Sequence, residues 1–289
     1  MALSANQVKE LRDKTGAGMM DCKKALEEAN GDYEKAVEIL RKKGAAVAAK
    51  RAERAANEGL VLTKIFNDGK TAAIVEVNCE TDFVAKSDDF VAFANLALEA
   101  VVSNQPADVD ALMALTVNGK NLAEELNAII GKIGEKIQVS RFSIESMPNG
   151  MVVDYIHHGS KLGVVITADN VPADKTSEFT PILKDIAMQI AAMRPVSIYR
   201  EEVDKTMVEK EMDIYKEIAR KEGKPEQILE KIATGKLNKF YEENCLFEQV
   251  FVKDNTKKVS QLIEDFNKKN GTQAKLIQFK RFHLSDEKK

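Results

Sequence analysis

An order of strand-like and helix-like segments that occurs twice is the feature that most constrains how this chain can fold. Two strands, two helices and a closing strand are expected between residues 59 and 147, and the same order recurs between residues 148 and 284. A small sheet covered by helices accounts for each copy better than a single winding sheet would. The sequence therefore predicts an α+β protein with a duplicated β-β-α-α-β core.

Local patterns give the bounds of these segments. Apolar and β-branched runs flank the turn sequence Asn67-Asp-Gly-Lys70, which is typical of a β-hairpin. In the first copy we expect strands at 59–66 and 71–79, helices at 88–103 and 121–135, and a closing strand at 137–144. In the second copy we expect strands at 151–157 and 162–168, helices at 177–193 and 257–268, and a closing strand at 274–283.

Residues 196–235 interrupt the second copy, which is therefore expected to consist of 148–195 and 236–284. A turn at Gly223-Lys-Pro225 separates two helical segments with apolar residues on one side. This pattern indicates an inserted antiparallel helical hairpin. Such a hairpin is either a self-contained protrusion or an arm that contacts another protein or a second copy of the chain, giving a homodimer.

Residues 1–45 form a separate group of three expected helices. Ser4 and Gln7 make a capping box, and Gly-containing turns at 15–18 and 30–32 separate the helices, the third of which is expected to stop near Gly44. A small apolar set can fill the interior of this N-terminal module: Val8, Leu11, Cys22, Leu26, Val37 and Leu40. Residues 46–58 are interpreted as an Ala-rich helical linker.

Two adjacent methionines stand at the start of the second expected helix. Met19 and Met20 would point about 100° apart on a helix, so both can hardly be central to the module, and one is expected to face a partner. The nearby Gly16-Ala-Gly18 run matches neither the P-loop nor the dinucleotide-binding fingerprint, and no strand precedes it. It therefore predicts no nucleotide site.

An aromatic residue that fits neither the strand nor the helix period lies in the connector of the first copy. Phe83 follows the second expected strand, in Thr81-Asp-Phe-Val84. A loop aromatic on a rigid scaffold can offer a partner a large contact area at little entropic cost. The alternative is that Phe83 folds back as a lid on the local core. The second copy has Val171-Pro172 in the corresponding segment, so the two copies are not expected to be functionally equivalent.

Two longer motifs resemble signatures of a known family. They are Glu76-Val-Asn-Cys-Glu-Thr-Asp-Phe-Val-Ala85 and the stretch from Leu11 to Leu26, which reads LRDKTGAGMMDCKKAL. Both resemble motifs of bacterial translation elongation factor Ts, and looser similarity extends over nearly the whole chain. Each motif is long and unlike a common structural pattern, so their joint occurrence in this order makes the resemblance specific.

The resemblance implies a guanine nucleotide exchange factor for the translational GTPase elongation factor Tu. In that family the loop matched by Thr81, Asp82, Phe83 and Val84 wedges between helices of the GTPase near its magnesium ion and loosens the phosphates. The magnesium ion and the nucleotide belong to the partner, so no cofactor is expected in this chain. Some members continue past the last strand into a further helix that packs on the partner. The tail 285–289 gives no basis for expecting that contact here.

The resemblance also implies contacts outside this loop. The N-terminal module is similar to a ubiquitin-associated helical bundle, which in this family docks on the nucleotide-binding domain of the GTPase. The matching motif assigns partner contacts to Arg12, Met19 and Met20. A histidine in Tyr155-Ile-His-His-Gly159 is a further expected contact. We assign it to His157, although His158 is its neighbour on the expected strand.

Composition argues against several other classes. The formal net charge is −3 with both signs interspersed, which leaves no broad basic surface for nucleic acid. No nucleophile-elbow pattern surrounds a serine, and the three scattered cysteines lack zinc-site or disulfide spacing, so we expect neither covalent catalysis nor a metal site. No apolar stretch is long enough to cross a membrane, and no signal peptide is recognisable, so a cytoplasmic protein is expected.

Two other functions compete with nucleotide exchange. An RNA-binding translation accessory protein is suggested by the basic residues Lys50, Arg51 and Arg54 and by the aromatic residues Phe279 and Phe282 of the closing strand. Steep salt dependence of RNA affinity would support it. A ubiquitin-associated adaptor that works through residues 1–45 alone is the other alternative, and it predicts that the core can be deleted without loss of activity.

Overall fold

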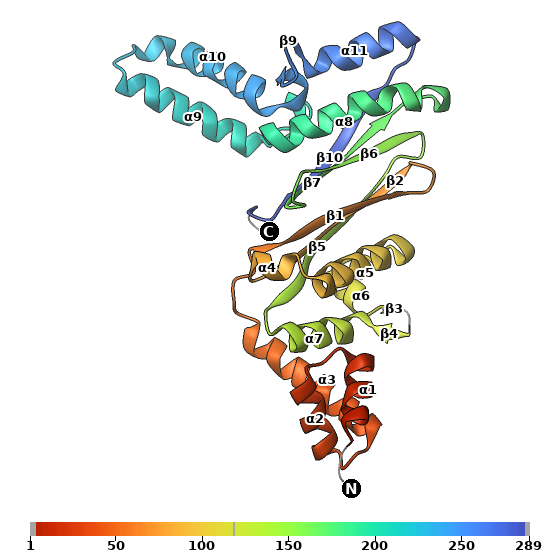
Figure 1. Cartoon of the computed structure of the whole chain (residues 1–289). Helices are drawn as coiled ribbons and strands as arrows, with labels where there is room; N and C mark the ends of the chain where they lie inside the picture. The colour runs from red at the N-terminus through yellow and green to blue at the C-terminus, as the bar shows by residue number, and fades with distance from the viewer. Residues whose placement is uncertain (1–3, 118, 287–289) are drawn as a thin grey trace.

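Two three-stranded antiparallel sheets pack face to face at the centre of the molecule. The computed structural model describes residues 4–117 and 119–286, and Figure 1 shows the two sheets stacked between helical layers. Both sheets have the same strand order, because β1-β2-β5 of the first corresponds to β6-β7-β10 of the second. The strands are β1 Glu58–Phe66, β2 Thr71–Cys79, β5 Ile137–Ser146, β6 Gly150–Ile156, β7 Leu162–Asp169 and β10 Lys275–His283. The predicted α+β fold is confirmed.

Helices cover the outer face of each sheet. The first sheet carries α5 Asp88–Asn104 and α7 Leu122–Ile133, and the second carries α8 Thr176–Met193 and α11 Val259–Asn270. Shorter segments complete both copies: α4 Asp82–Ala85, α6 Val109–Met113, β3 Thr116–Val117, β4 Lys120–Asn121, η1 Ala173–Lys175, η2 Arg200–Glu202, η3 Leu246–Glu248, β8 Val250–Phe251 and β9 Asp254–Lys258. The two small hairpins β3–β4 and β8–β9 were not predicted, because strands this short carry no readable period.

The turn residues explain where the elements of the first copy begin and end. Asn67, Asp68 and Gly69 all have positive φ, as a tight turn between β1 and β2 requires. The hydroxyl of Ser87 accepts a hydrogen bond from the backbone N–H of Phe90 and caps α5, as its position in the sequence predicts. Gly134 ends α7 in the left-handed conformation.

Apolar residues that face away from the helices hold the two sheets together. Val61 and Ile74 of the first copy pack against Val152 and Val165 of the second. Gly163 lies in this interface, where an added Cβ would approach Val61 Cγ1 to 2.7 Å. The central strand β2 is consequently buried on both faces over its whole length, since one face meets α5 and the other meets the second sheet.

The N-terminal module contains α1 Ala5–Thr15, α2 Met19–Glu28 and the first part of α3 Tyr33–Arg51. The Ser4–Gln7 capping box is confirmed. The predicted end of the third helix near Gly44 is wrong, because α3 continues through Gly44 to Arg51 and takes in most of the expected linker. Gly44 does not break the helix because the backbone of α7 packs directly against it. Residues 52–57 form no further helix.

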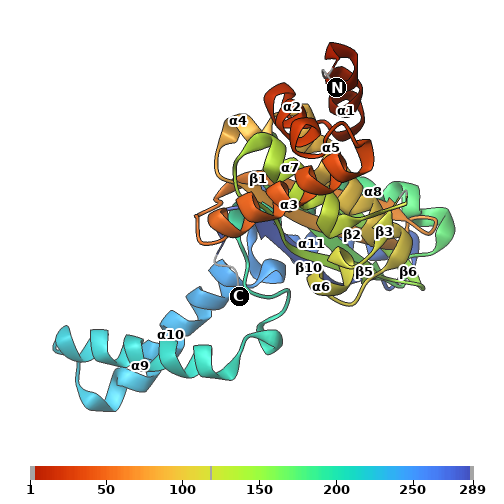
Figure 2. The same ribbon diagram turned by 90° about the horizontal axis from the view of Figure 1, so that it is seen from below.

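The inserted hairpin consists of α9 Lys205–Lys221 and α10 Glu226–Asn244. It projects from the sheets as an arm (Figures 1 and 2). The expected end at residue 235 is wrong, because α10 runs on to Asn244, where Phe240 packs with Val203 at the base of the arm. An isolated parallel β-bridge between Ser197 and Cys245 closes this base.

Two further features are not tied to one element. The three cysteines, Cys22, Cys79 and Cys245, are free and buried. Within residues 4–117 and 119–286, no helix combines the length and apolar character that crossing a membrane requires.

Candidate functional site

The connector after β2 forms a single short helical turn, α4, which we call the Phe83 turn (residues 81–86). Thr81 begins it, and its hydroxyl oxygen accepts a hydrogen bond from the backbone N–H of Val84 at 3.4 Å. The backbone N–H and the hydroxyl of Thr81 both donate to the carboxylate of Glu135, at 3.1 and 2.8 Å. At the other end the hydroxyl of Ser87 donates to the carbonyl of Val84 at 2.8 Å. The turn is therefore held at both ends.

Phe83 is the most exposed large hydrophobic residue among those described, with 82% of its surface accessible. Its neighbours behave differently: Ala85 is buried at 5%, and Val84 packs against the core of the first copy. The alternative in which Phe83 folds back as a lid is therefore wrong. The turn anchors itself through Val84 and Ala85 and presents Phe83 to the outside.

Asp82 lies partly exposed beside Phe83. Its carboxylate accepts a hydrogen bond from Lys86 Nζ at 2.9 Å, which is the main reason that the pKa of Asp82 lies below its ordinary value. Lys161 lowers the pKa of Asp82 further, although it belongs to the second copy. The acidic side chain beside the exposed ring is thus held in its charged form.

The expected histidine contact lies in the turn between β6 and β7. His157 and His158 were expected on a strand, but β6 ends at Ile156 and both histidines belong to the turn. The Tyr155 hydroxyl and His157 Nδ1 are 2.8 Å apart. This turn meets the first copy, because the backbone N–H of Val61 donates to the carbonyl of Ser160 at 2.7 Å. His157 and His158 are both exposed.

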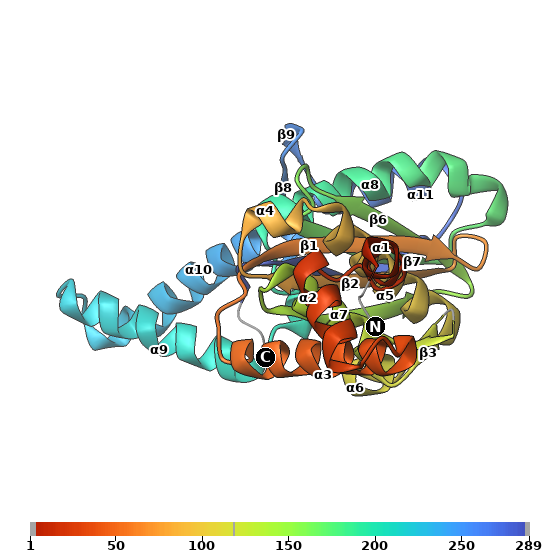
Figure 3. The same cartoon turned by 60° about the horizontal axis from the view of Figure 1, so that its bottom comes forward.

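The module exposes all three of its expected contact residues. Met19 and Met20 are 45% and 61% accessible, so both, rather than one, face outward. Arg12 is exposed on α1. In Figures 1 to 3, α2 and α4 lie toward the same side of the molecule. The chain thus has two exposed apolar features, one on α2 of the module and one on α4 of the core.

The second copy lacks an equivalent site. Its connector contains η1, and Val171 there is buried at 6%. No exposed large hydrophobic residue lies between β7 and α8. The two connectors therefore differ in structure, and the functional inequivalence of the two copies stays a prediction.

Two supporting glutamates were not predicted from the sequence. Glu135, just after the C-terminal end of α7, fixes the start of the Phe83 turn, and Glu80 is held by Arg51 at 3.0 and 3.1 Å. Glu80 was visible only as part of a motif. Glu135 carries no local signal, because the residue that it fixes is 54 positions away in the chain.

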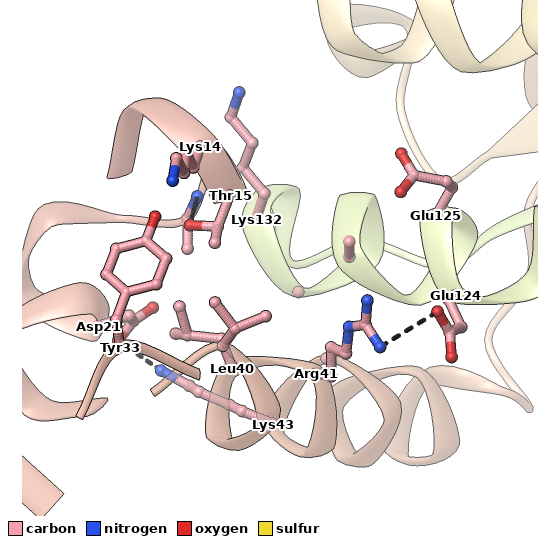
Figure 4. Close-up of a pocket in the computed structure, with 15 residues that line it drawn as sticks. Lys14, Thr15, Asp21, Tyr33, Leu40, Arg41, Lys43, Glu124, Glu125 and Lys132 are labelled. Atoms are coloured by element: carbon pink, nitrogen blue, oxygen red, sulfur yellow. Dashed lines mark hydrogen bonds and ion pairs between the residues drawn. The ribbon is translucent and has the colours of Figure 1, made fainter. Parts of the chain in front are cut away.

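The largely apolar cavity at the junction of module and core has a volume of about 200 Å³. Figure 4 shows Leu40 of α3 at its centre, with ion pairs Arg41–Glu124 and Lys43–Asp21 at its margin. These charged side chains are paired. Among the residues that the structure describes, no group of three or more His, Cys, Asp or Glu is arranged to hold a metal ion.

Comparison with known proteins gives the class to which this site belongs. The model of the family described as elongation factor TS matches residues 80–286. Two relatives are named elongation factor Ts. The protein from Prosthecochloris aestuarii is 44% identical to this chain and that from Chlorobaculum tepidum is 46% identical, each over 286 residues, which is 98% of this chain and 98% of the relative. The elongation factor Ts of Clostridium botulinum strain Alaska E43 is 46% identical, over 98% of this chain and 93% of its own.

The fold and these matches define a translation elongation factor that works without covalent catalysis of its own. The chain belongs to the elongation factor Ts family. The relatives extend over the N-terminal module as well as the duplicated core, since they cover nearly all of this chain.

Proposed function

We propose that this chain binds the GDP-bound form of elongation factor Tu in the cytoplasm and promotes GDP release during translation elongation. The observation that carries the proposal is Phe83, an aromatic side chain 82% exposed on a turn that Glu135 and Ser87 hold in place. Large aromatic residues on rigid supports are typical of the few residues that dominate interface energies. Asp82, charged and adjacent, adds a group that can disturb the partner's magnesium and phosphate site.

Exchange of this kind needs only binding energy. If the protein weakens the affinity of the GTPase for GDP by some factor, then GDP must weaken the affinity for this protein by the same factor. The Phe83 turn therefore need not touch the nucleotide. It needs only to fit the nucleotide-free form of the partner better than the GDP-bound form.

The N-terminal module supplies a second contact in this proposal. Met19 and Met20 present flexible apolar side chains, a residue type that adapts well to partner surfaces. Arg12 adds a charged group on the neighbouring helix. The module would hold the nucleotide-binding domain while the Phe83 turn acts on it, and His157 would add a contact from the second copy.

The packing of the basic and aromatic residues favours exchange over RNA binding. Arg51 and Arg54 are paired with Glu80, at 3.0 and 3.3 Å. Phe282 is 7% exposed and lies beneath the Arg141 guanidinium. A base can stack only on an exposed ring, so these residues are poorly placed for single-stranded RNA.

The exposed face of the arm supports a proposed contact between two copies. Met207, Ile214 and Ile218 recur on one side of α9, and each is about 40% exposed. A homodimer would cover this face. This proposed dimer contact uses α9 and not the Phe83 turn.

Release of a fluorescent GDP analogue from elongation factor Tu tests the proposed exchange. Stopped-flow fluorescence with excess unlabelled GDP would record the release rate with and without the protein. We expect the rate to rise with the concentration of the protein and then to saturate. A release rate that does not depend on that concentration would contradict the proposal.

A further inference from the structure

The module and the core share one helix. In its first half, Ala36, Val37 and Leu40 of α3 belong to the apolar cluster of the module. In its second half, Val47 and Ala48 pack against the core of the first copy. At 1.5 Å per residue the 19-residue helix is about 28 Å long. The direction of this single helix on the core therefore fixes the direction of the module.

A glycine crossing sets that direction at the middle of α3. An ideal Cβ on Gly44 would lie 2.5 Å from the backbone oxygen of Asn127 on α7, and one on Gly131 would lie 2.9 Å from Gly44 Cα. The two helix backbones are therefore in contact, and no larger residue fits without moving them apart. Glycine inside a helix is destabilising relative to alanine. The close approach accounts for its presence at both positions.

Apart from α3, the module makes few contacts with the core. The cavity of about 200 Å³ in Figure 4 separates α1 and α2 from α7, with Gly44 and Gly131 among its lining residues. Because this cavity lies beside the module, the α3–α7 crossing at Gly44 and Gly131 is the main contact that keeps the module from tilting on the core. Lys132 bridges part of the gap, since an added Cβ on Gly16 would lie 3.6 Å from its Nζ.

The end of α3 is fastened to the residue that precedes the Phe83 turn. Arg51 donates to both carboxylate oxygens of Glu80, at 3.0 and 3.1 Å, and Arg54 adds a third hydrogen bond at 3.3 Å. The backbone N–H of Lys136 donates to the same carboxylate at 2.7 Å. Thr81, the next residue, is held by Glu135. The end of α3 is thus tied through the Glu80 side chain to the residue that directly precedes the Phe83 turn.

We propose that α3 is a rigid spacer that fixes the position of Phe83 relative to the docking module, with Gly44 and Glu80 as positioning residues of the exchange reaction. The inference rests on the proposed function, because it assigns both contacts to one partner. Two contacts joined rigidly at the matching distance act as one bivalent ligand, and the second forms without a further search. Loosening the spacer removes this advantage although neither contact is changed.

Distance measurements and exchange rates on the same variants test the proposal. Spin labels on Lys24→Cys and Asp88→Cys, exposed positions on the module and next to the Phe83 turn, report the spacing by pulsed electron resonance. Gly44→Ala loosens the crossing with α7 in the middle of the spacer, and the double variant Arg51→Ala/Arg54→Ala loosens its C-terminal attachment to Glu80. The matched control is Lys42→Gln, because Lys42 pairs at 2.8 Å with Glu38 of α3 itself and not with the core.

We expect a narrow distance distribution in the parent and the control, and a shifted or broadened one in both loosened variants. Stimulated GDP release at subsaturating concentration should fall at least about tenfold in the loosened variants, with a smaller loss at saturation, as expected when effective concentration is lost. Thermal melts identify any variant that fails to fold. If Gly44→Ala fails to fold, the double variant still tests the proposal, because it changes only two side chains at and just after the C-terminal end of α3.

Two results would overturn the proposal that α3 is a rigid spacer. One is an unchanged distance distribution in both loosened variants, and the other is a broadened distribution with undiminished exchange. A parent protein that does not accelerate GDP release would instead overturn the proposed function, and the distances would still report whether α3 holds the module in place.

Discussion

At the residue scale, the exposed ring of Phe83 depends on small polar groups that never face the partner. Thr81 caps the turn, and Glu135 holds Thr81 through two hydrogen bonds. Val84 and Ala85 anchor the turn to the core. Rigid support matters because an ordered side chain loses little further entropy when it binds.

Phe83→Ala should leave the fold unchanged and slow stimulated GDP release at least about tenfold at subsaturating concentration, as loss of a hot-spot side chain worth more than ~1.4 kcal/mol would. Melting temperature checks the fold, since the ring makes little contact with the protein. Val252→Ala is the matched control, because Val252 is also exposed, at 49%, but lies in the β8–β9 hairpin. Equal loss in both variants would remove the special role of Phe83.

The fastening of Glu80 predicts a pH dependence of stability. Burial by itself raises the pKa of Glu80, but the Lys136 N–H and the Arg51 and Arg54 guanidinium groups bring it below the ordinary value of 4.5. A carboxyl with a lowered pKa in the folded state stabilises the fold above its unfolded-state pKa, and this contribution is lost as pH falls through the folded-state pKa.

Urea unfolding of the parent and Glu80→Gln should therefore differ most near neutral pH, and the difference should shrink below about pH 4.5. The exposed Glu53→Gln variant is the control and should track the parent. A difference that grows on acidification would have the wrong sign for this network.

At the scale of elements, the module and the arm differ in how they join the core. The module shares α3 with the core and has its own apolar interior, whereas the arm leaves from a narrow base between Ser197 and Cys245. Changes to the module surface should therefore act on binding, and removal of the arm should act on assembly.

Met19→Asp combined with Met20→Asp should weaken binding to elongation factor Tu at least about tenfold without lowering the melting temperature, because both side chains are exposed and charged groups are costly in an apolar contact. Calorimetry measures the affinity. Lys23→Asp, an exposed change on the same helix, is the control for charge alone. Unchanged affinity in the methionine variant would show that this surface is not an anchor.

Replacement of residues 206–238 by a short flexible linker should leave a cooperative thermal transition. The base of the arm remains, since Val203, Phe240 and Cys245 are kept, and the two sheets close without the arm. Light scattering should report a smaller assembly than that of the full chain. Loss of cooperative melting would show that the arm is part of the core, and an unchanged assembly state would remove its proposed contact role.

At the scale of the whole molecule, the interface between the two sheets makes one body of the two copies. Gly163 lies there, with the positions of Val61 Cγ1 and Ile74 Cδ1 at 2.7 and 3.3 Å from an added Cβ. The charged pair Glu76–Arg141 lies in the same region at 2.8 Å, and Glu76 is fully buried. The site depends on this interface, because the turn with His157 comes from the second copy.

Gly163→Val should lower the free energy of unfolding by about 1–3 kcal/mol or more, because extra methyl groups force the packed sheets apart. Urea titration measures the change. Gly69→Ala provides a control at a turn with open space around it, where only the positive φ is strained. A Gly163 variant as stable as the parent would mean that the sheets separate at little cost.

The order of elements, the duplication and the unusual position of Phe83 can all be read from the sequence. Helical periods and apolar or β-branched runs placed ten of the main segments, and Phe83 stood out because it belongs to neither pattern. The family motifs gave the class, which the comparisons confirm. These are local signals, so they can be read without knowing which residues meet in space.

Contacts between elements could not be predicted from the sequence and are visible only in the folded chain. Gly44 was interpreted as the end of a helix because glycine is a common helix terminator, but contact with α7 keeps the helix continuous there. Glu135 and Glu80 became supports of the Phe83 turn through partners distant in the chain. Packing and long-range hydrogen bonds depend on which faces meet, and a sequence period gives each face without its partner.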